Sequence, residues 1–124
     1  MIRGIGIDSV SISRMGKVSE GFIRKYFHEA EQADYAALSE AHDDIKNRFL
    51  ASRFAVKEAY AKAVGKGFSS DVIPNEICTK KNESGAPYVC LYGKTLKQNG
   101  SLKCYLSITH EADLAVAVVV IEED

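Results

Sequence analysis

The stretch that most constrains the fold covers residues 53–65 and reads RFAVKEAYAKAVG. Alanine recurs in it and no proline interrupts it, so its intrinsic preference is helical. Gly65 supplies the stop signal that is expected just past a helix end. The acidic Asp43 and Asp44 suit the start of a helix, which predicts one long helix from residue 43 or 44 through Val64. Small and apolar residues occupy nearly every side of this helix, and such a helix is buried.

Two charged residues of this helix, Glu58 and Lys62, stand four positions apart and therefore lie on one face. Charges on a buried helix are costly unless they are paired. One explanation is an ion pair within the helix, worth roughly 0.2–0.5 kcal/mol on an exposed surface. The other is a functional site in which the carboxylate binds a hard cation and the ammonium binds a phosphate. The helix alone leaves both explanations open.

The size and charge of the chain exclude several classes of protein. Its 124 residues fit one domain, and 46% hydrophobic with 27% charged residues is an ordinary globular composition. A net charge of -1 argues against a nucleic-acid-binding protein. No apolar run approaches ~18 residues and the N-terminus lacks a signal-peptide core, so we expect a cytoplasmic protein without a membrane segment. The three cysteines Cys78, Cys90 and Cys104 have no metal-site spacing, and we expect core thiols.

Residues 2–10 are predicted to form a strand that carries glycines on one face. Gly4, Gly6 and Asp8 share that face, while Ile5 and Ile7 share the other. Glycines inside a strand mark the close approach of a ligand or of another backbone. Asp8 would then lie beside a surface that has no side chains, although the local sequence by itself favours Asp8 as the cap of a following short helix.

The remaining pattern predicts an α+β fold in a single domain, residues 1–124, with a long buried helix packed on an antiparallel sheet. The predicted elements beyond those above are a basic helical segment at 11–26, a helix at 29–39, a hairpin of strands 75–80 and 88–92, a short helix at 93–98, and strands 102–109 and 114–121. The last of these is a continuous apolar run, which is typical of a central strand.

Several residues together suggest one chemistry. Asp8 and Glu58 could jointly hold Mg²⁺, which takes one or two carboxylates plus phosphate oxygens and water. His110 follows the strand at 102–109 and could contact a phosphate or a base; its alternative is an ordinary turn histidine. Phosphates could also be met by backbone N–H groups of the turn at Gly65 and by four cations. These cations are Lys46, Arg53, Lys62 and Lys66.

Two segments resemble a known family. GIGID at residues 4–8 together with RFAVKEAYAK at 53–62 looks like the paired signature of the 4′-phosphopantetheinyl transferases. The short length and the ending LSITH at 106–110 followed by AVAVVV at 115–120 resemble the bacterial holo-[acyl-carrier-protein] synthase branch.

This resemblance implies a Mg²⁺-dependent transferase of fatty acid biosynthesis. Coenzyme A gives its 4′-phosphopantetheine arm to a serine of apo-acyl carrier protein, and adenosine 3′,5′-bisphosphate leaves. Asp8 and Glu58 would bind the metal, with Glu58 and Lys62 as the catalytic residues. Lys62 would stabilise the pyrophosphate or protonate the leaving phosphate, and the base for the serine would be a metal-bound water or Glu58.

The same resemblance implies where coenzyme A binds. Arg53 and His110 match positions that hold its 3′-phosphate end. Gly85 and Pro87 resemble a turn near the nucleotide, with Ser84 in place of an asparagine. The full expected set is Lys46, Arg53, Lys62, Gly65, Gly85, Pro87, Thr109 and His110.

The resemblance also implies a homotrimer with active sites between subunits and an acidic, helical carrier protein as partner. Arg14 matches the docking arginine of the family, and Arg24 and Lys25 extend its basic stripe. The chain departs from the family at Ser11, commonly a glutamate, and at His28, commonly a threonine. These departures affect carrier docking and fine positioning.

Overall fold

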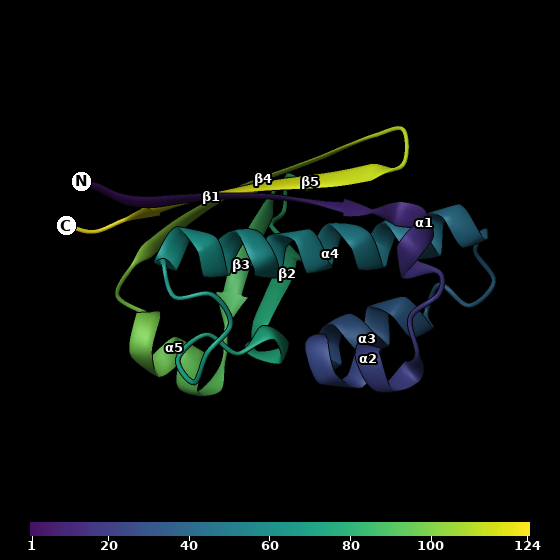
Figure 1. Ribbon diagram of the computed structural model, residues 1–124, viewed down its shortest axis with the longest axis horizontal. Coiled ribbons are helices and arrows are strands. Elements are labelled where there is room, and N and C mark those ends of the chain that lie inside the picture. The colour runs from purple at the N-terminus through teal and green to yellow at the C-terminus, as the bar shows by residue number, and fades with distance from the viewer.

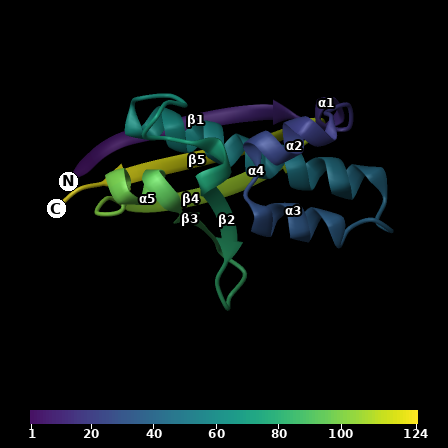
Figure 2. The ribbon, with the colours of Figure 1, turned by 90° about the horizontal axis from the view of Figure 1, so that it is seen from below.

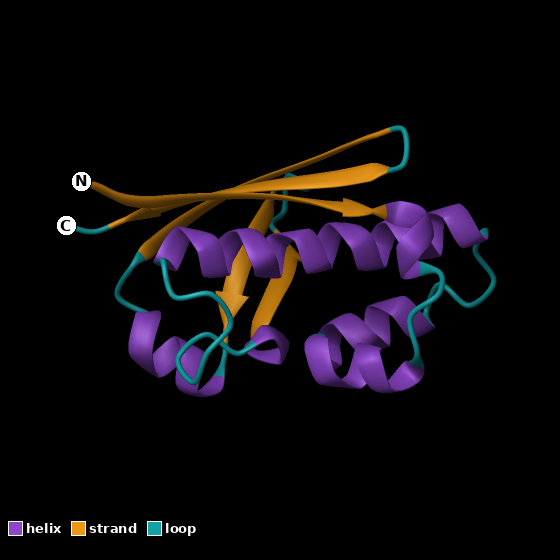
Figure 3. Cartoon of the chain, in the orientation of Figure 1, coloured by secondary structure: helices purple, strands orange, loops and turns teal.

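The computed structural model describes residues 1–124 as an α+β domain (Figures 1 and 3). Its helices are α1 (Ile12–Met15), α2 (Glu20–Tyr26), α3 (Glu29–Ala36), α4 (Asp43–Val64), α5 (Gly93–Asn99) and the 3₁₀ turn η1 (Pro74–Glu76). Its strands are β1 (Ile2–Ser11), β2 (Ile77–Lys81), β3 (Pro87–Leu91), β4 (Lys103–Glu111) and β5 (Leu114–Glu122). None of the helices is both long enough and apolar enough to cross a membrane.

The strands form two antiparallel sheets, both packed against α4. The larger sheet has the order β1-β5-β4, so the apolar run at 114–122 is the central strand, as predicted. The smaller sheet is the hairpin β2–β3. Figure 1 shows the larger sheet on one side of α4 and α2, α3 and α5 on the other, while α1 lies beside α4 at the end of β1 and the hairpin runs across α4. Seen from below, the hairpin projects between α5 and α3 (Figure 2).

Helix α4 is the long buried helix that its sequence predicts. The His42 side chain accepts a hydrogen bond from Asp44 N at its start, and the next residue, Asp43, adds negative charge there. Gly65 ends the helix with φ 89°, a left-handed conformation that glycine adopts without a steric penalty. Its buried residues include Ala55, Ala59 and Ala63, which let the larger sheet come close.

Strand β1 lies with its glycines against the backbone of α4. A Cβ atom on Gly6 would stand 1.9 Å from the carbonyl oxygen of Ala59, and one on Gly4 would stand 1.9 Å from that of Ala63. The close approach predicted from the sequence is therefore that of another backbone. The contact fixes β1 directly beside the helix that carries Glu58.

The structure corrects four local predictions. Ser11, not Asp8, caps α1 with its side chain. The basic segment at 11–26 is two helices, because Gly16 ends α1 and Ser19 caps α2. Asn75 and Glu76 belong to the 3₁₀ turn η1, so β2 starts at Ile77. Of the three cysteines, only Cys78 is fully buried; Cys90 and Cys104 are partly exposed.

The buried ion pair of α4 is formed by Lys57 and Glu31, whereas the sequence suggested a pair between Glu58 and Lys62. Lys57 is 0% exposed and donates to Glu31 of α3 over 2.5 Å, and to the carbonyl oxygens of Pro74 and Ile77. Glu31 in turn accepts from Thr79 N at 3.2 Å. Burial lowers the pKa of Lys57, and Glu31 opposes that shift. This network ties α4 to α3 and to the β2–β3 hairpin.

Candidate active site

The two predicted metal ligands and the motif lysine meet in one cavity of about 440 Å³. Asp8 belongs to β1, which lies against α4 because its glycines Gly4 and Gly6 contact the helix backbone. Glu58 and Lys62 belong to α4 itself. The rest of the lining includes one further cation and an apolar wall. These residues are Ser9, Val10, Arg14, Met15, Val18, Phe22 and Phe54.

Lys62 pairs with Asp8 and not with Glu58. Its ammonium donates to Asp8 Oδ1 and to the carbonyl oxygen of Ile7, each over 3.0 Å. The ion pair between Glu58 and Lys62 that the helix suggested is therefore not formed. Burial raises the pKa of Glu58, the facing Asp8 carboxylate raises it further, and the Lys62 charge offsets part of the rise.

Two facing carboxylates with mutually unfavourable charge suit a hard divalent cation. The negative charge of Asp8 raises the pKa of Glu58 by repulsion between the two carboxylates. A cation bound between them would remove this repulsion. No group of three or more histidine, cysteine or acidic side chains is placed to hold a metal ion by itself. The donor set of two carboxylates fits Mg²⁺, whose remaining positions are usually filled by phosphate oxygens and water.

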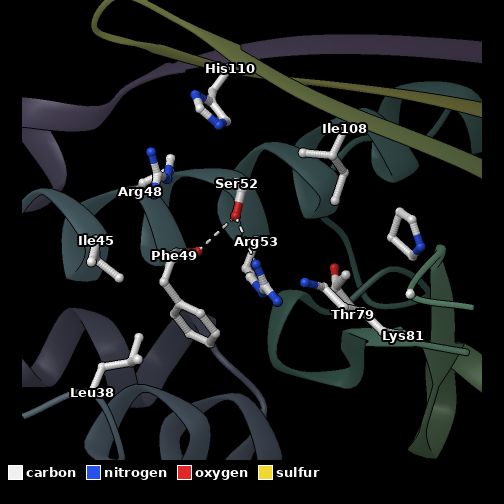
Figure 4. A pocket seen from close by; sticks show the side chains of 12 residues that line it. Leu38, Ile45, Arg48, Phe49, Ser52, Arg53, Thr79, Lys81, Ile108 and His110 are labelled. Atoms are coloured by element: carbon white, nitrogen blue, oxygen red, sulfur yellow. Dashed lines mark hydrogen bonds between the residues drawn. The ribbon is translucent and has the colours of Figure 1, made fainter. Parts of the chain in front are cut away.

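A second cavity, of about 430 Å³, lies between α4, the β2–β3 hairpin and β4 (Figure 4). Four residues predicted to bind coenzyme A meet there: Arg53 from α4, Gly85 and Pro87 from the hairpin, and His110 from the end of β4. Ile108, on the same strand as His110, contributes apolar surface. Arg53 and His110, which are 57 positions apart in the chain, therefore line the same cavity.

Arg53 is one of the cations of this second cavity, and its guanidinium is incompletely hydrogen-bonded. Its guanidinium lies 4.2 Å from the Phe49 ring centroid and donates to Ser52 Oγ at 3.0 Å, as Figure 4 shows. Its Nε atom is buried without a hydrogen-bond partner, as is the hydroxyl of the neighbouring Thr79. Burial lowers the pKa of Arg53, and Glu31 opposes that shift. A partly buried guanidinium with a free N–H group is suited to bind an anion.

The other residues expected to bind coenzyme A lie outside this cavity. Thr109 points to the opposite, outer face of the sheet from His110, because side chains alternate along β4. Lys46 lies 5.8 Å from the Tyr35 ring centroid. Gly65 caps α4. Lys66, which the sequence suggested only as a cation for a phosphate, pairs with Asp71 at 3.3 Å. Their role in binding stays a prediction.

Sequence reasoning missed several residues of the second cavity. Arg48 and Phe49 stand one turn before Ser52 and Arg53 on α4, a spacing that could have indicated them. Lys81 and Thr79 come from the hairpin, and only its packing against α4 brings them there. Arg48 and Lys81 add positive charge beside Arg53.

The two cavities have no lining residue in common and open on different sides of α4. Phe49 and Glu58 are nine positions apart, which at 100° per residue places them on opposite sides of the helix. One chain therefore presents the carboxylates and the Arg53 cavity in different directions.

The three predicted docking cations lie around the first cavity or on α2. Arg14, on α1, lines the cavity beside Asp8. Arg24 pairs with Glu20 at 3.9 Å, and Lys25 lies 5.2 Å from the Tyr26 ring centroid. Both α2 cations are on an exposed helix whose salt bridge is weak.

Comparison with known proteins agrees with this arrangement. A holo-[acyl-carrier-protein] synthase of Nitratidesulfovibrio vulgaris (strain DP4) is 38% identical over 129 residues, covering 98% of this chain and 99% of that protein. The crystal structure of a holo-(acyl-carrier-protein) synthase from Bacillus anthracis in complex with CoA (3′,5′-ADP) aligns with a TM-score of 0.84 and 33% identity, over 100% and 99% of the two chains. That of the Neisseria meningitidis holo-[acyl-carrier-protein] synthase gives 0.85 and 32%, over 99% and 100%. A family model described as the 4′-phosphopantetheinyl transferase superfamily matches residues 4–119. The chain belongs to the 4′-phosphopantetheinyl transferase superfamily.

Proposed function

We propose that this chain is a holo-[acyl-carrier-protein] synthase, which transfers 4′-phosphopantetheine from coenzyme A to a serine of apo-acyl carrier protein and releases adenosine 3′,5′-bisphosphate. The observation that carries the proposal is the meeting of Asp8, Glu58 and Lys62 in one cavity. Relatives whose similarity covers nearly the whole chain are holo-[acyl-carrier-protein] synthases. The crystal structure of one of them was determined in complex with CoA (3′,5′-ADP). We assign the reaction to fatty acid biosynthesis in the cytoplasm. The three cysteines are free thiols, which is the usual state of cysteine in that compartment.

Asp8 and Glu58 would hold the Mg²⁺. When bound, the ion would neutralise charge on the pyrophosphate and orient its oxygens for in-line displacement. Lys62 is half exposed at the cavity rim, with its side chain 54% accessible, so its ammonium can leave Asp8 and reach a phosphate. In this position it would stabilise the negative charge that develops on the leaving phosphate.

The apolar side of the same cavity would keep water away from the phosphorus that is attacked. Phe22 and Phe54 line the cavity, and their ring centroids are 5.5 Å apart. Tyr26 joins this cluster at 4.6 Å from Phe22. A dry wall favours transfer to the serine of the carrier protein over hydrolysis.

The second cavity would bind the nucleotide end of coenzyme A. Arg53, with its unpartnered buried Nε, would bind the 3′-phosphate, assisted by His110. Arg48 and Lys81 add charge at the same place, and Gly85 and Pro87 would border the nucleotide.

The separation of the two cavities supports a trimer in which neighbouring copies complete each site. The outer face of the larger sheet is apolar and exposed: Ile5 is 63% and Ile7 58% accessible. Register places Val120 opposite both Ile5 and Tyr105, so the apolar surface is continuous across three strands. Burying such a face against other copies would stabilise the trimer and bring the Arg53 cavity of one copy toward Glu58 of the next.

The carrier protein would dock at the mouth of the first cavity. Arg14 stands there beside Asp8, and Arg24 and Lys25 extend the positive surface on α2. Charges on the rim of an interface mainly set the association rate and its salt dependence.

The decisive experiment is the mass shift of an apo-acyl carrier protein incubated with coenzyme A and Mg²⁺. Asp8→Asn and Glu58→Gln should each slow modification by about 100-fold or more, because the developing charge loses its counter-ion. Glu40→Gln, an exposed carboxylate of the α3–α4 turn, is the matched control and should act like the wild type. Wild-type rates in either cavity variant would refute the assignment.

The shared site has a separate test by subunit mixing. Arg53→Ala and Glu58→Gln should each be inactive alone. In mixed trimers, about one quarter of the sites would combine two intact halves, so activity should return to about 25% of the wild type. Failure to recover activity after verified subunit exchange would place both halves in one copy.

A further inference from the structure

The β2–β3 hairpin places two cysteines directly opposite one another, and the proposed reaction uses neither. Cys78 of β2 is paired in register with Cys90 of β3. Opposite residues of an antiparallel pair project on the same face of the sheet, so the two thiols lie side by side. On this face Cys78 is 1% exposed, while Cys90 is partly exposed.

The hydrogen-bonding pattern of the hairpin fixes how far apart these cysteines are. Tyr92 N donates to Glu76 O, and Asn82 N donates to Ala86 O, each over 2.9 Å. The intervening Thr79 N turns away from the ladder and donates to Glu31. Because hydrogen-bonded pairs alternate along an antiparallel ladder, Cys78 and Cys90 form such a pair, with Cα atoms typically about 5.5 Å apart.

That separation is within the range that a disulfide requires. Cα atoms of bonded cysteines usually stand about 4.4–6.8 Å apart. The thiols therefore need no movement of the strands to be joined.

The surroundings of Cys90 suit reaction with an oxidant. Lys80 is on the same face, with its ammonium 5.6 Å from the Tyr92 ring centroid. The Tyr92 hydroxyl, as a hydrogen-bond partner, and the nearby Cys90 thiol raise the pKa of Lys80. A partly exposed thiol beside a cation is the common setting of redox-active cysteines, and a second cysteine nearby can resolve the first product. Burial raises the pKa of Cys78 to about 11 and leaves this residue 1% exposed. Cys90 is partly exposed, so it is the thiol that an oxidant reaches first.

We propose that Cys78 and Cys90 form a reversible cross-strand disulfide under oxidising conditions. The Cys90 thiolate attacks one sulfur of oxidised glutathione, forms a mixed disulfide and releases one glutathione. The Cys78 sulfur, after losing its proton to solvent, attacks the Cys90 sulfur and releases the second glutathione. Two thiols are thus oxidised by two electrons, and oxidised glutathione is reduced to two glutathione molecules.

The bond would join the two strands that form one wall of the Arg53 cavity. Thr79 and Lys81 lie on β2, and Pro87 starts β3. Oxidation would therefore restrict the twist of this hairpin, which gives the site a redox-sensitive wall.

The test is peptide mapping of the intact protein after equilibration in glutathione buffers from fully reduced to fully oxidised. We expect a Cys78–Cys90 peptide and the loss of two hydrogen atoms from the mass, both reversed by dithiothreitol. Three free thiols, or only a glutathione adduct on Cys90, at the oxidised end would overturn the proposal.

The third cysteine provides the matched control. Cys104 is on β4, in the other sheet, and burial raises the pKa of its thiol to about 12. Cys104→Ser should form the disulfide as the wild type does, whereas Cys90→Ser should retain two free thiols. A disulfide that includes Cys104 would also contradict the proposed pairing. None of these readouts depends on transferase activity.

Discussion

Lys62 on α4 donates a 3.0 Å hydrogen bond to Asp8 on β1, while Glu58, one turn away on the same helix, has no ion pair. The cation of the motif therefore occupies one of the two carboxylates that we expect to bind Mg²⁺. In the absence of coenzyme A the lysine and the metal would compete for Asp8.

This competition predicts opposite effects of Lys62→Met on binding and on catalysis. Mg²⁺ binding without coenzyme A should become up to about fivefold tighter, since a half-exposed pair contributes at most about 1 kcal/mol. Transfer to the carrier protein should slow, because the leaving phosphate loses its cation. Titration calorimetry and the mass-shift assay measure the two effects. Lys66→Met, whose cation pairs with Asp71 outside the cavity, is the control. Weaker Mg²⁺ binding in the Lys62 variant would contradict the competition.

Removing the buried Lys57 should destabilise the fold strongly. Lys57→Met leaves the carboxylate of Glu31 buried and uncompensated, at a cost of about 3–5 kcal/mol in the free energy of unfolding. The double variant Lys57→Met/Glu31→Gln should recover part of this loss, because no buried charge remains. Urea unfolding of the two variants checks both statements. A double variant less stable than Lys57→Met would show that the other hydrogen bonds of Glu31 dominate.

Gly6 should tolerate no side chain. In Gly6→Ala the new Cβ would stand 1.9 Å from Ala59 O, so β1 or α4 must shift, and such overpacking costs about 1–3 kcal/mol or more. Gly21→Ala is the matched control, since its Cβ would meet nothing closer than 3.7 Å and alanine is the better helix former. Thermal unfolding should show a lower midpoint for the first variant and an unchanged or higher one for the second. Equal midpoints would contradict the close approach of β1.

Asp113, in the turn after β4, predicts a pH-dependent stability. Its carboxylate accepts from Ser13 Oγ at 2.7 Å, Ser11 Oγ at 2.8 Å and Ser13 N at 2.9 Å, and these bonds lower its pKa. The folded-state pKa is thus below the unfolded one, so the stabilisation is present at neutral pH and is lost as the pH falls through the folded-state value.

Asp113→Asn should therefore be less stable than the wild type at pH 7, and the difference should shrink below about pH 4. Urea unfolding across this range measures the difference. The Michaelis constant for the carrier protein should rise several-fold, because Asp113 holds the start of α1, which carries Arg14. A stability difference that is constant with pH would show that the hydrogen bonds do not depend on the carboxylate charge.

The sequence was sufficient to predict the elements whose signals are local. Helix α4 has helix-forming residues, acidic residues at its start and Gly65 at its end, and strand β5 has an unbroken apolar run. The glycine-bearing face of β1 was also predicted, because side chains alternate along a strand.

Partners that depend on packing could not be predicted from spacing. Lys57 and Glu31 are 26 positions apart, and only the packing of α3 against α4 and β2 makes them a pair. Lys62 could reach Glu58 by spacing, yet β1 lies near enough to offer Asp8 instead. Lys81 was missed for the same reason, because the position of the hairpin is set by tertiary contacts.

The main-chain contact between β1 and α4 has a consequence for the choice of metal ion. Asp8 follows Gly6 by two residues, and Glu58 directly precedes Ala59, whose carbonyl oxygen meets that glycine. The contact therefore fixes the separation of the two main-chain segments that carry these carboxylates, and only their side-chain torsions remain free. Main-chain segments held this close would favour small Mg²⁺ over Ca²⁺, which needs longer bonds and more ligands.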